Sequence, residues 1–306
     1  MQLLEILRCP FCRSELRPDG DALDCSGCGR TFGRAPDGIP LMLHRELPRA
    51  PEKLREAEGW LEKARTEGWY EPDDTVDAVL PFVNRELGWN DSNWLANGHS
   101  FEVLLDRYIA DGRGLRVLEV GAAKAWASRF WLERDCDYVA TDILVDESIG
   151  LGRGAFYGEF GRVQADGENL PFDDETFDVT YCVATLHHAL DLSRMVREMA
   201  RVTRHGGIVA GLNEGTRGLG RSADNPEQAG EKELGINEHV HTVWAYFAAF
   251  VRAGVTVRLM ERSDGRPPVP FGSFLSRMPK IGMTLGTLAH LSVYPYAGVS
   301  TYGRRR

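Results

Sequence analysis

The segment RVLEVGA (Arg116–Ala122) is an apolar run that stops at a glycine, and the next residues, AWASRFWLER (125–134), have helical spacing. A second apolar run, YVATDI (Tyr138–Ile143), carries an acid, Asp142, near its end, about 20 residues after the glycine turn. In an open parallel sheet, an acid at this position can accept hydrogen bonds from two ribose hydroxyls. The order of strand, turn, helix, strand and acid therefore predicts an α/β fold that binds a ribose-bearing ligand.

The block that follows contains further strand ends with polar residues, in ADGENLPFDDETFDVTYCVATLHHALDLSRMVREMARVTRHGGIVAGLNE (165–214). With VLEVGA and ATDI, it resembles the class I S-adenosylmethionine (SAM) dependent methyltransferases, in particular the ubiquinone-type C-methyltransferases. The resemblance implies a Rossmann-like sheet with helices on both faces. It also implies a set of cofactor-binding positions: Glu119 and Gly121 at the methionine end, Asp142 at the ribose, Asp166 and Gly167 at the adenine edge, Val183 to His187 in the floor, and in addition Ala123 and Ile143.

The glycine turn departs from the pattern of that family, acid-x-Gly-x-Gly-x-Gly. Ala123 and Ala125 stand at the second and third glycine positions, and a methyl group disfavours positive φ and narrows the approach of a ligand. Three interpretations remain open. The turn shifts slightly and SAM still binds; or the methionine part moves and contacts Lys124 or Trp126; or the fold serves another ligand or a non-catalytic role.

The front of the chain contains two cysteine pairs in metal-ligand spacing, Cys9-Pro-Phe-Cys12 and Cys25-Ser-Gly-Cys28. Two such knuckles across a hairpin form a four-thiolate tetrahedral cage, which zinc accepts in structural sites, with iron as the alternative. Four protein ligands leave no open coordination position. The metal is therefore expected to stabilise the fold and to take no part in chemistry.

The sequence around these cysteines (3–43) resembles the small zinc-ribbon proteins that activate methyltransferases acting on tRNA, rRNA and translation factors. In that family the ribbon is a separate subunit that stabilises its catalytic partner. Fusion on one chain raises the effective concentration of the two parts, so we expect the ribbon to pack against the methyltransferase core without a separate activator. The alternative is that the ribbon recognises a substrate.

Composition limits the classes of function. The chain has 306 residues and a net charge of −9, which repels phosphate backbones and disfavours binding to RNA or DNA. The sequence contains no apolar run of about 18 residues, and its N-terminus does not have the pattern of a signal peptide. We therefore expect a cytoplasmic protein without stable membrane insertion.

Between the two modules, PEKLREAEGWLEKARTEGW (51–69) has helical spacing with charged outer positions, which predicts a helical connector. The connector is rich in aromatic residues, which either pack in the core or wall the acceptor pocket. In related methyltransferases the segment before the first strand closes over SAM. By this resemblance, Asn97, His99 and Phe101 are candidate lid residues.

Beyond Asn213 a Gly-, Arg- and acid-rich segment (213–235) lacks apolar periodicity and is too long for a simple connection, which favours a mobile or substrate-binding loop. GINEHVHTVWAYFAAFVRAG (235–254) then predicts a helix and VTVRLMER (255–262) a strand. Residues 268–303 are expected to form a broken cap and a final antiparallel strand, with a membrane-touching flap as the alternative.

Methyl transfer from a sulfonium depends mostly on positioning, and a base is needed only when the acceptor must lose a proton. Histidine is the side chain suited to this near neutral pH, and the candidates are His187, His188, His239 and His241. Each pair also has a purely structural interpretation. His187 and His188 would hydrogen-bond to the next helix, and His239 and His241 would lie at an exposed helix start. A metal site at Glu238, His239 and His241 is a further alternative.

Together these observations predict three parts: a zinc ribbon (1–45), a helical connector and lid (46–111), and a SAM-dependent methyltransferase domain with a C-terminal substrate cap (112–306). The expected acceptor is a small molecule, a saccharide or a lipid-linked intermediate. The alternatives are an rRNA or tRNA base methyltransferase and a non-catalytic SAM-fold scaffold. The sequence also leaves room for a homodimer.

Overall fold

The computed structural model describes residues 3–222, 228–268, 279–294 and 296–306. The N-terminal part contains α1 (Leu3–Ile6), β1 (Leu16–Asp19), β2 (Ala22–Cys25), β3 (Thr31–Phe32), α2 (Ala50–Glu67), α3 (Asp74–Asp77), α4 (Val83–Glu86), α5 (Ser92–Leu104) and the π-helical turn η1 (Leu105–Ile109). The central part contains β4 (Arg116–Val120), α6 (Ser128–Leu132), β5 (Asp137–Asp142), η2 (Leu151–Tyr157), β6 (Gly161–Gln164), β7 (Phe177–Val183), η3 (Leu186–His188), α7 (Leu192–Val202) and β8 (Thr203–Arg217). The C-terminal part contains α8 (Ala229–Glu233), β9 (His241–Thr242), α9 (Val243–Arg252), β10 (Val255–Arg262), α10 (Pro279–Val293) and β11 (Tyr296–Arg305).

The main sheet has the strand order β10-β11-β8-β7-β4-β5-β6, and β9 pairs with β8. The strands from β6 to β8 are parallel, whereas β11 runs antiparallel to both β8 and β10. The chain passes from β4 to β5 and β6 on one side and then returns to β7 on the other side of β4. The switch in strand order, where open α/β sheets bind ligands, therefore lies between β4 and β7.

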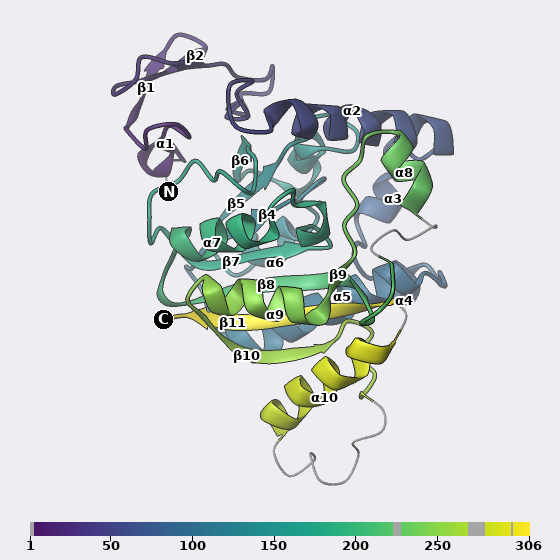
Figure 1. The fold of residues 1–306 in the computed structure, drawn as a ribbon. Helices are drawn as coiled ribbons and strands as arrows, with labels where there is room; N and C mark the ends of the chain where they lie inside the picture. The colour runs from purple at the N-terminus through teal and green to yellow at the C-terminus, as the bar shows by residue number, and fades with distance from the viewer. Residues whose placement is uncertain (1–2, 223–227, 269–278, 295) are drawn as a thin grey trace.

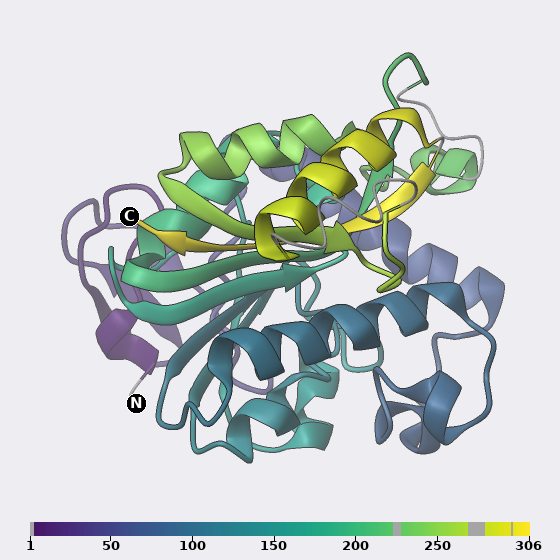
Figure 2. The ribbon, with the colours of Figure 1, turned by 90° about the horizontal axis from the view of Figure 1, so that it is seen from below.

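Helices cover both faces of this sheet, as the sequence predicts. Figure 2 shows α9 and α10 on one face and α5 on the other. The helix α7 illustrates why: Leu192, Met195, Val196 and Met199 recur at helical spacing and are all buried. The strand β7 is buried along nearly its whole length, as expected for a parallel strand between two helical layers.

The small antiparallel sheet β1-β2-β3 carries the cysteine pairs and packs against the main domain. The backbone N–H of Arg8 donates to the Pro171 carbonyl at 2.8 Å, and the N–H of Met42 donates to the Gln164 carbonyl on β6 at 3.0 Å. Leu7 and Phe32 of this module belong to the same buried apolar cluster as Phe172 of the core. The expected packing of the two modules is confirmed, and Figure 1 shows the module and α2 along one edge of the molecule, opposite α10.

Two local predictions differ from the structure, and part of two further segments cannot be compared. The helix after the glycine turn begins only at Ser128, because the residues before it form the turn itself. β8 continues past Asn213 to Arg217, so part of the predicted loop is a strand. Residues 223–227 of that loop and 269–278 of the predicted cap or flap lie outside the described residues.

Among the described residues, the helices are all too short or too polar to cross a lipid bilayer.

Candidate active site

A cavity of about 300 Å³ lies at the carboxyl ends of β4, β5 and β7, at the switch in strand order. Its size is in the range of small-molecule sites. The lining is largely apolar and consists of Lys53, Glu56, Trp60, Trp69, Val120, Gly121, Ala123, Asp142, Ile143, Leu144, Ile149, Ala165, Asp166, Gly167, Val183, Ala184, Thr185, His188, Ala189 and Met195. The structure thus brings together most of the predicted cofactor positions. Glu119 and His187 are not among the lining residues.

The turn after β4 keeps a glycine-like backbone although two of its residues are alanines. Gly121 has φ 71°, and a Cβ there would lie 2.1 Å from the Thr185 side chain, so both conformation and space require glycine. Ala123 and Ala125 also have positive φ, at 45° and 56°. The alanines therefore adopt the left-handed region themselves. Lys124 points to Asp77, with Nζ 3.1 Å from Oδ1.

The Asp142 carboxylate links the two turns that border the cavity. Its Oδ2 accepts a hydrogen bond from the Ala123 N–H at 2.8 Å, and its Oδ1 accepts one from the Leu144 N–H at 2.8 Å. Each carboxylate oxygen can accept a further hydrogen bond. Asp142 is therefore fixed in orientation and still able to accept from two hydroxyls.

Glu119 lies beneath the turn, where it is 1 % exposed. Its carboxylate accepts hydrogen bonds from the hydroxyl of Tyr181 at 2.6 Å and from the hydroxyl of Tyr138. Burial raises the pKa of Glu119 to about 7 against the opposing effect of the two hydroxyls. This acid therefore contacts buried tyrosines and does not face the cavity.

Asp166 and Gly167 border the cavity on the β6 side. Burial raises the pKa of Asp166 to about 6, although Lys53 opposes the shift. Lys53 forms a buried ion pair with Glu168 of the same loop, Nζ to Oε1 3.2 Å, and donates to the His188 carbonyl at 3.2 Å. A lysine of α2 thus joins the loop after β6 to the turn after β7.

The connector contributes to the cavity wall through α2 and Trp69, and not through the predicted lid residues. Lys53, Glu56 and Trp60 of α2 line the cavity. Phe101 instead lies in the core of the opposite sheet face, and Asn97 hydrogen-bonds to Asn213 at 2.7 Å. Asn97, His99 and Phe101 do not line the cavity, because α5, which carries them, packs along β8 and β11.

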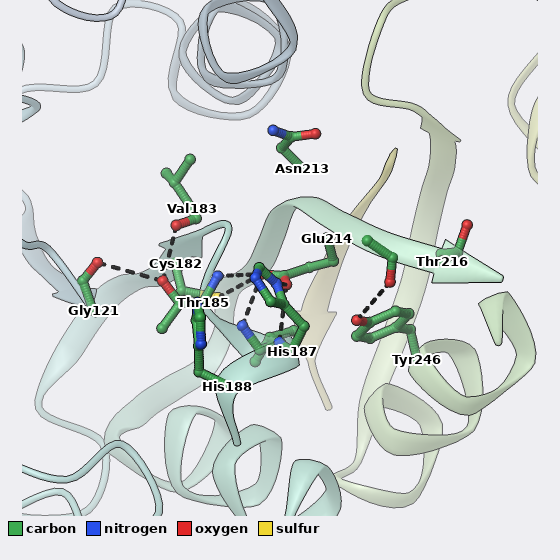
Figure 3. Close-up of polar contacts among 12 residues, drawn as sticks. Gly121, Cys182, Val183, Thr185, His187, His188, Asn213, Glu214, Thr216 and Tyr246 are labelled. Carbon is green, nitrogen blue, oxygen red and sulfur yellow. Dashed lines mark hydrogen bonds and ion pairs between the residues drawn. The ribbon is translucent and has the colours of Figure 1, made fainter. Parts of the chain in front are cut away.

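Sequence reasoning missed Glu214, which organises the turn after β7. The Glu214 carboxylate accepts hydrogen bonds from the backbone N–H groups of Thr185 and Leu186 at 3.0 Å and of His187 at 3.2 Å, and it lies 2.9 Å from His187 Nδ1 (Figure 3). Burial opposes its ionisation, but these donors outweigh burial and lower its pKa. Its position directly after Asn213, where the sequence predicts the end of a strand, is the signal available in the sequence.

His188 lies between two carboxylates from other segments. Its Nδ1 is 3.1 Å from Glu56 Oε1, 3.9 Å from Glu238 Oε1 and 2.6 Å from the Asn237 carbonyl. Burial disfavours the imidazolium, but the carboxylates outweigh burial and raise the pKa of His188 to about 9. His188 is therefore protonated at neutral pH in the absence of another cation.

The second histidine pair lies beside the first. The His239 N–H donates to the His187 carbonyl at 3.0 Å, and the rings of His239 and His241 are 6.1 Å apart. Both residues precede α9, with His241 in β9. Burial lowers the pKa of His241 to about 4. The structure thus gathers all four candidate histidines, although only His188 lines the cavity.

The four cysteines of the N-terminal module converge with their sulfur atoms within 4.8 Å of one another. Cys9 Sγ and Cys28 Sγ are 3.6 Å apart, and Cys12 Sγ and Cys25 Sγ are 3.3 Å apart. A tetrahedral ion at about 2.3 Å from each thiolate requires sulfur separations of about 3.8 Å. The backbone N–H groups of Gly27 and Cys28 point to Cys25 Sγ at 3.4 Å. The donor set therefore fits a structural zinc site.

Comparison with known proteins agrees with this arrangement. Residues 118–211 match the methyltransferase domain family, and residues 2–32 match the Trm112p-like protein family. A demethylmenaquinone methyltransferase of Corynebacterium urealyticum is 35 % identical over 97 residues, 32 % of this chain and 40 % of the relative. A ubiquinone/menaquinone biosynthesis C-methyltransferase of Idiomarina loihiensis is 33 % identical over 118 residues, 35 % of this chain and 47 % of the relative. The match thus spans less than half of the length of these relatives.

Solved structures show the same fold at low identity. A geranyl diphosphate methyltransferase in complex with GPP and sinefungin superposes with a TM-score of 0.55 at 14 % identity. The superposition covers 84 % of this chain and 100 % of that chain. The [4+2]-cyclase SpnF superposes with a TM-score of 0.50 at 18 % identity, over 77 % and 97 % of the two chains. The chain therefore joins an N-terminal segment that matches the Trm112p-like protein family to a Rossmann-like domain that matches the methyltransferase domain family.

Proposed function

We propose that the protein is a SAM-dependent methyltransferase that acts on a small-molecule acceptor. The observation that carries this proposal is the cavity at the switch in strand order, which is lined by Asp142 and lies within a matched methyltransferase domain. When bound there, SAM supplies an electrophilic methyl group. The residues of the chain bind and orient the donor and exclude water, which is most of what this reaction requires.

We assign parts of the donor to parts of the cavity. Asp142 accepts from the ribose hydroxyls, because its carboxylate is fixed by two backbone N–H groups. Asp166 and Gly167 border the adenine, and Gly121 with Thr185 borders the methionine end. Glu119 supports the turn from below through its tyrosine contacts, and α2 closes the cavity with Trp60.

The acceptor is proposed to be a small or carrier-linked molecule, such as a quinone-like ring, a saccharide or a lipid-linked intermediate. Three observations support this class. The relatives include demethylmenaquinone and malonyl-[acyl-carrier protein] methyltransferases. The cavity is lined mainly by apolar side chains. The net charge of −9 opposes the binding of a nucleic acid.

Calorimetric titration with SAM tests the donor site. We expect the wild type to bind SAM and Asp142→Ala to bind it about 100-fold more weakly, because two hydrogen bonds to a carboxylate are lost. Asp135→Ala, which removes an exposed acid next to the same strand, is the control and should keep wild-type affinity. Unchanged affinity in Asp142→Ala contradicts the ribose assignment, and no SAM binding by the wild type contradicts the function.

Incubation with methyl-labelled SAM and fractionated cell extract tests the acceptor class. We expect the label to enter the fraction of small metabolites and lipids. Label in RNA would contradict the proposal and support the rRNA or tRNA alternative. Binding of SAM without transfer to any fraction would support a scaffold.

We also propose that Cys9, Cys12, Cys25 and Cys28 hold a structural Zn²⁺, as the separation of their sulfur atoms and the Trm112p-like match support. Elemental analysis of the purified protein should find zinc, and Cys12→Ser with Cys28→Ser should remove one equivalent.

A further inference from the structure

His187, His188 and Glu238 bring two imidazoles and one carboxylate together beside the cavity, with ligand atoms within 4.8 Å of one another. The histidines belong to η3 after β7, and Glu238 belongs to the segment before β9. The two rings lie 4.2 Å apart, and His187 Nε2 is 3.8 Å from Glu238 Oε2. Segments separated by about 50 residues of sequence therefore converge on one point.

The orientation of His187 is the first reason to assign a ligand here. Glu214 accepts from three backbone N–H groups and is held as an acceptor, so His187 Nδ1 donates its proton to it at 2.9 Å (Figure 3). In the neutral imidazole, Nε2 then carries the lone pair and faces the Glu238 carboxylate. Glu238 Oε2 accepts a hydrogen bond from Gln228 Nε2 at 2.5 Å, and its 3.8 Å contact with the Nε2 lone pair of His187 is favourable only with a proton or a cation between the two atoms. In metal sites, a ligating histidine usually donates its other ring N–H to a carboxylate or a carbonyl, as His187 does to Glu214.

The balance of charge is the second, independent reason. Glu56, Glu214 and Glu238 are buried, at 1 %, 1 % and 6 % exposure. Within the part of the chain that the structure describes, every ion pair recorded for these three carboxylates is with His187 or His188. Buried carboxylates are stable only when they are paired or coordinated to a metal. Two histidines against three carboxylates leave an excess of negative charge even when both rings are protonated.

We propose that His187, His188 and Glu238 form a binding site for a divalent transition-metal cation of the zinc or cobalt type. Two imidazoles and one carboxylate are a ligand set that zinc uses in sites with an open coordination position. An ion at about 2.1 Å from each ligand requires ligand atoms within about 4.2 Å, so small side-chain rotations suffice. His188 lines the cavity, so the open position can take water or an oxygen atom of the acceptor. The metal site does not depend on the proposed methyl transfer.

The test uses CoCl₂ titrated into the full-length protein whose four-cysteine module is already loaded with zinc. We expect one further equivalent of Co²⁺ to bind, with a visible spectrum that lacks thiolate charge-transfer bands. Glu238→Gln keeps the shape of the side chain and should weaken cobalt binding at least about 10-fold, and His187→Ala should do the same. His205→Ala, at an exposed histidine that pairs with Glu175, is the matched control and should bind Co²⁺ as the wild type does.

The zinc content of the cysteine module and the thermal unfolding of each variant show whether it is folded. Absence of cobalt binding by the folded wild type, or unchanged binding in folded Glu238→Gln, overturns the metal site. SAM affinity is measured on the same samples, so the two proposals can fail separately. SAM binding without cobalt binding overturns the metal site alone, and cobalt binding without SAM binding overturns the proposed function alone.

Discussion

Ala123 and Ala125 adopt a backbone conformation that glycine occupies at no cost, with φ of 45° and 56°. For an L-residue with a Cβ, the left-handed region costs roughly 1–2 kcal/mol. The two positions differ in their surroundings, because Ala123 is exposed whereas Ala125 is fully buried. The same substitution is therefore expected to act differently at the two sites.

Ala123→Gly should increase the free energy of unfolding by about 1 kcal/mol, because it removes the left-handed strain and loses no buried surface. Ala125→Gly should leave the free energy of unfolding nearly unchanged, because the loss of a buried methyl group, about 0.8 kcal/mol, offsets the relief of strain. Urea unfolding of both variants measures this difference. Equal effects would contradict the explanation by burial.

Glu119 gives the stability of the protein a specific pH dependence. Its pKa of about 7 in the folded protein lies above the usual 4.5, so the folded protein holds a proton that the unfolded chain releases between these pH values. The stabilisation is complete below pH 4.5 and is lost as the pH rises to 7, by about 3 kcal/mol in total. We expect Glu119→Gln to lose this component, so urea unfolding at pH 5 and pH 8 should differ less in the variant. An equal pH dependence in both proteins would show that Glu119 keeps an ordinary pKa.

At the scale of secondary-structure elements, the sheet could be predicted, whereas the cavity wall could be predicted only as one of two alternatives for the aromatic residues of the connector. Apolar runs such as RVLEV and FDVTYCV are typical of strands that are buried between two helical layers. Such runs can be recognised in the local sequence, and both strands form where they are expected. The role of α2 depends on where the whole helix docks, and helical spacing does not decide between core packing and the cavity wall for its aromatic residues. The spacing of Lys53, Glu56 and Trp60, three and four residues apart, places them on one face and was the signal available.

The candidate site also combines residues that the local sequence predicts with residues that only the tertiary fold brings together. Asp142 follows a strand, and its position in the lining of the cavity follows from the geometry of parallel sheets. The four histidines were found by residue type alone. Their carboxylate partners Glu56 and Glu214 come from α2 and β8, and only the tertiary fold shows that they meet.

Trp60→Ala tests the contribution of α2 to the donor site. The indole lines the cavity and contacts the His188 ring edge-on, with 5.7 Å between ring centroids. Its loss should weaken SAM binding about 10-fold, which corresponds to about 1.4 kcal/mol of lost apolar contact. Glu62→Ala, on the exposed outer part of the same helix, should keep wild-type affinity in the same calorimetric titration. If both variants bind SAM equally well, α2 does not close the donor site.

At the scale of the whole molecule, the N-terminal ribbon with its four cysteines and the methyltransferase domain share one core. Leu7, Leu23 and Phe32 of the ribbon lie in the same apolar cluster as Phe172 and Phe177 of the main domain. Polar contacts add to this interface: Arg13 of the ribbon pairs with Glu198 of α7, Nη2 to Oε2 2.9 Å. The two modules are therefore expected to unfold together.

Loss of the proposed zinc ion from the ribbon should destabilise the whole chain and not the ribbon alone. In Cys12→Ser/Cys28→Ser, which replaces two exposed ligands, we expect the free energy of unfolding to fall by more than about 4 kcal/mol and Tm to fall on the order of 10 °C. Calorimetry should show a single transition in the wild type, because the ribbon and the sheet bury each other's apolar surface. Cys136→Ala removes a thiol outside the ribbon and controls for the loss of a cysteine as such. A double serine variant whose main transition stays at the wild-type temperature would mean that the domain folds independently of its fused ribbon.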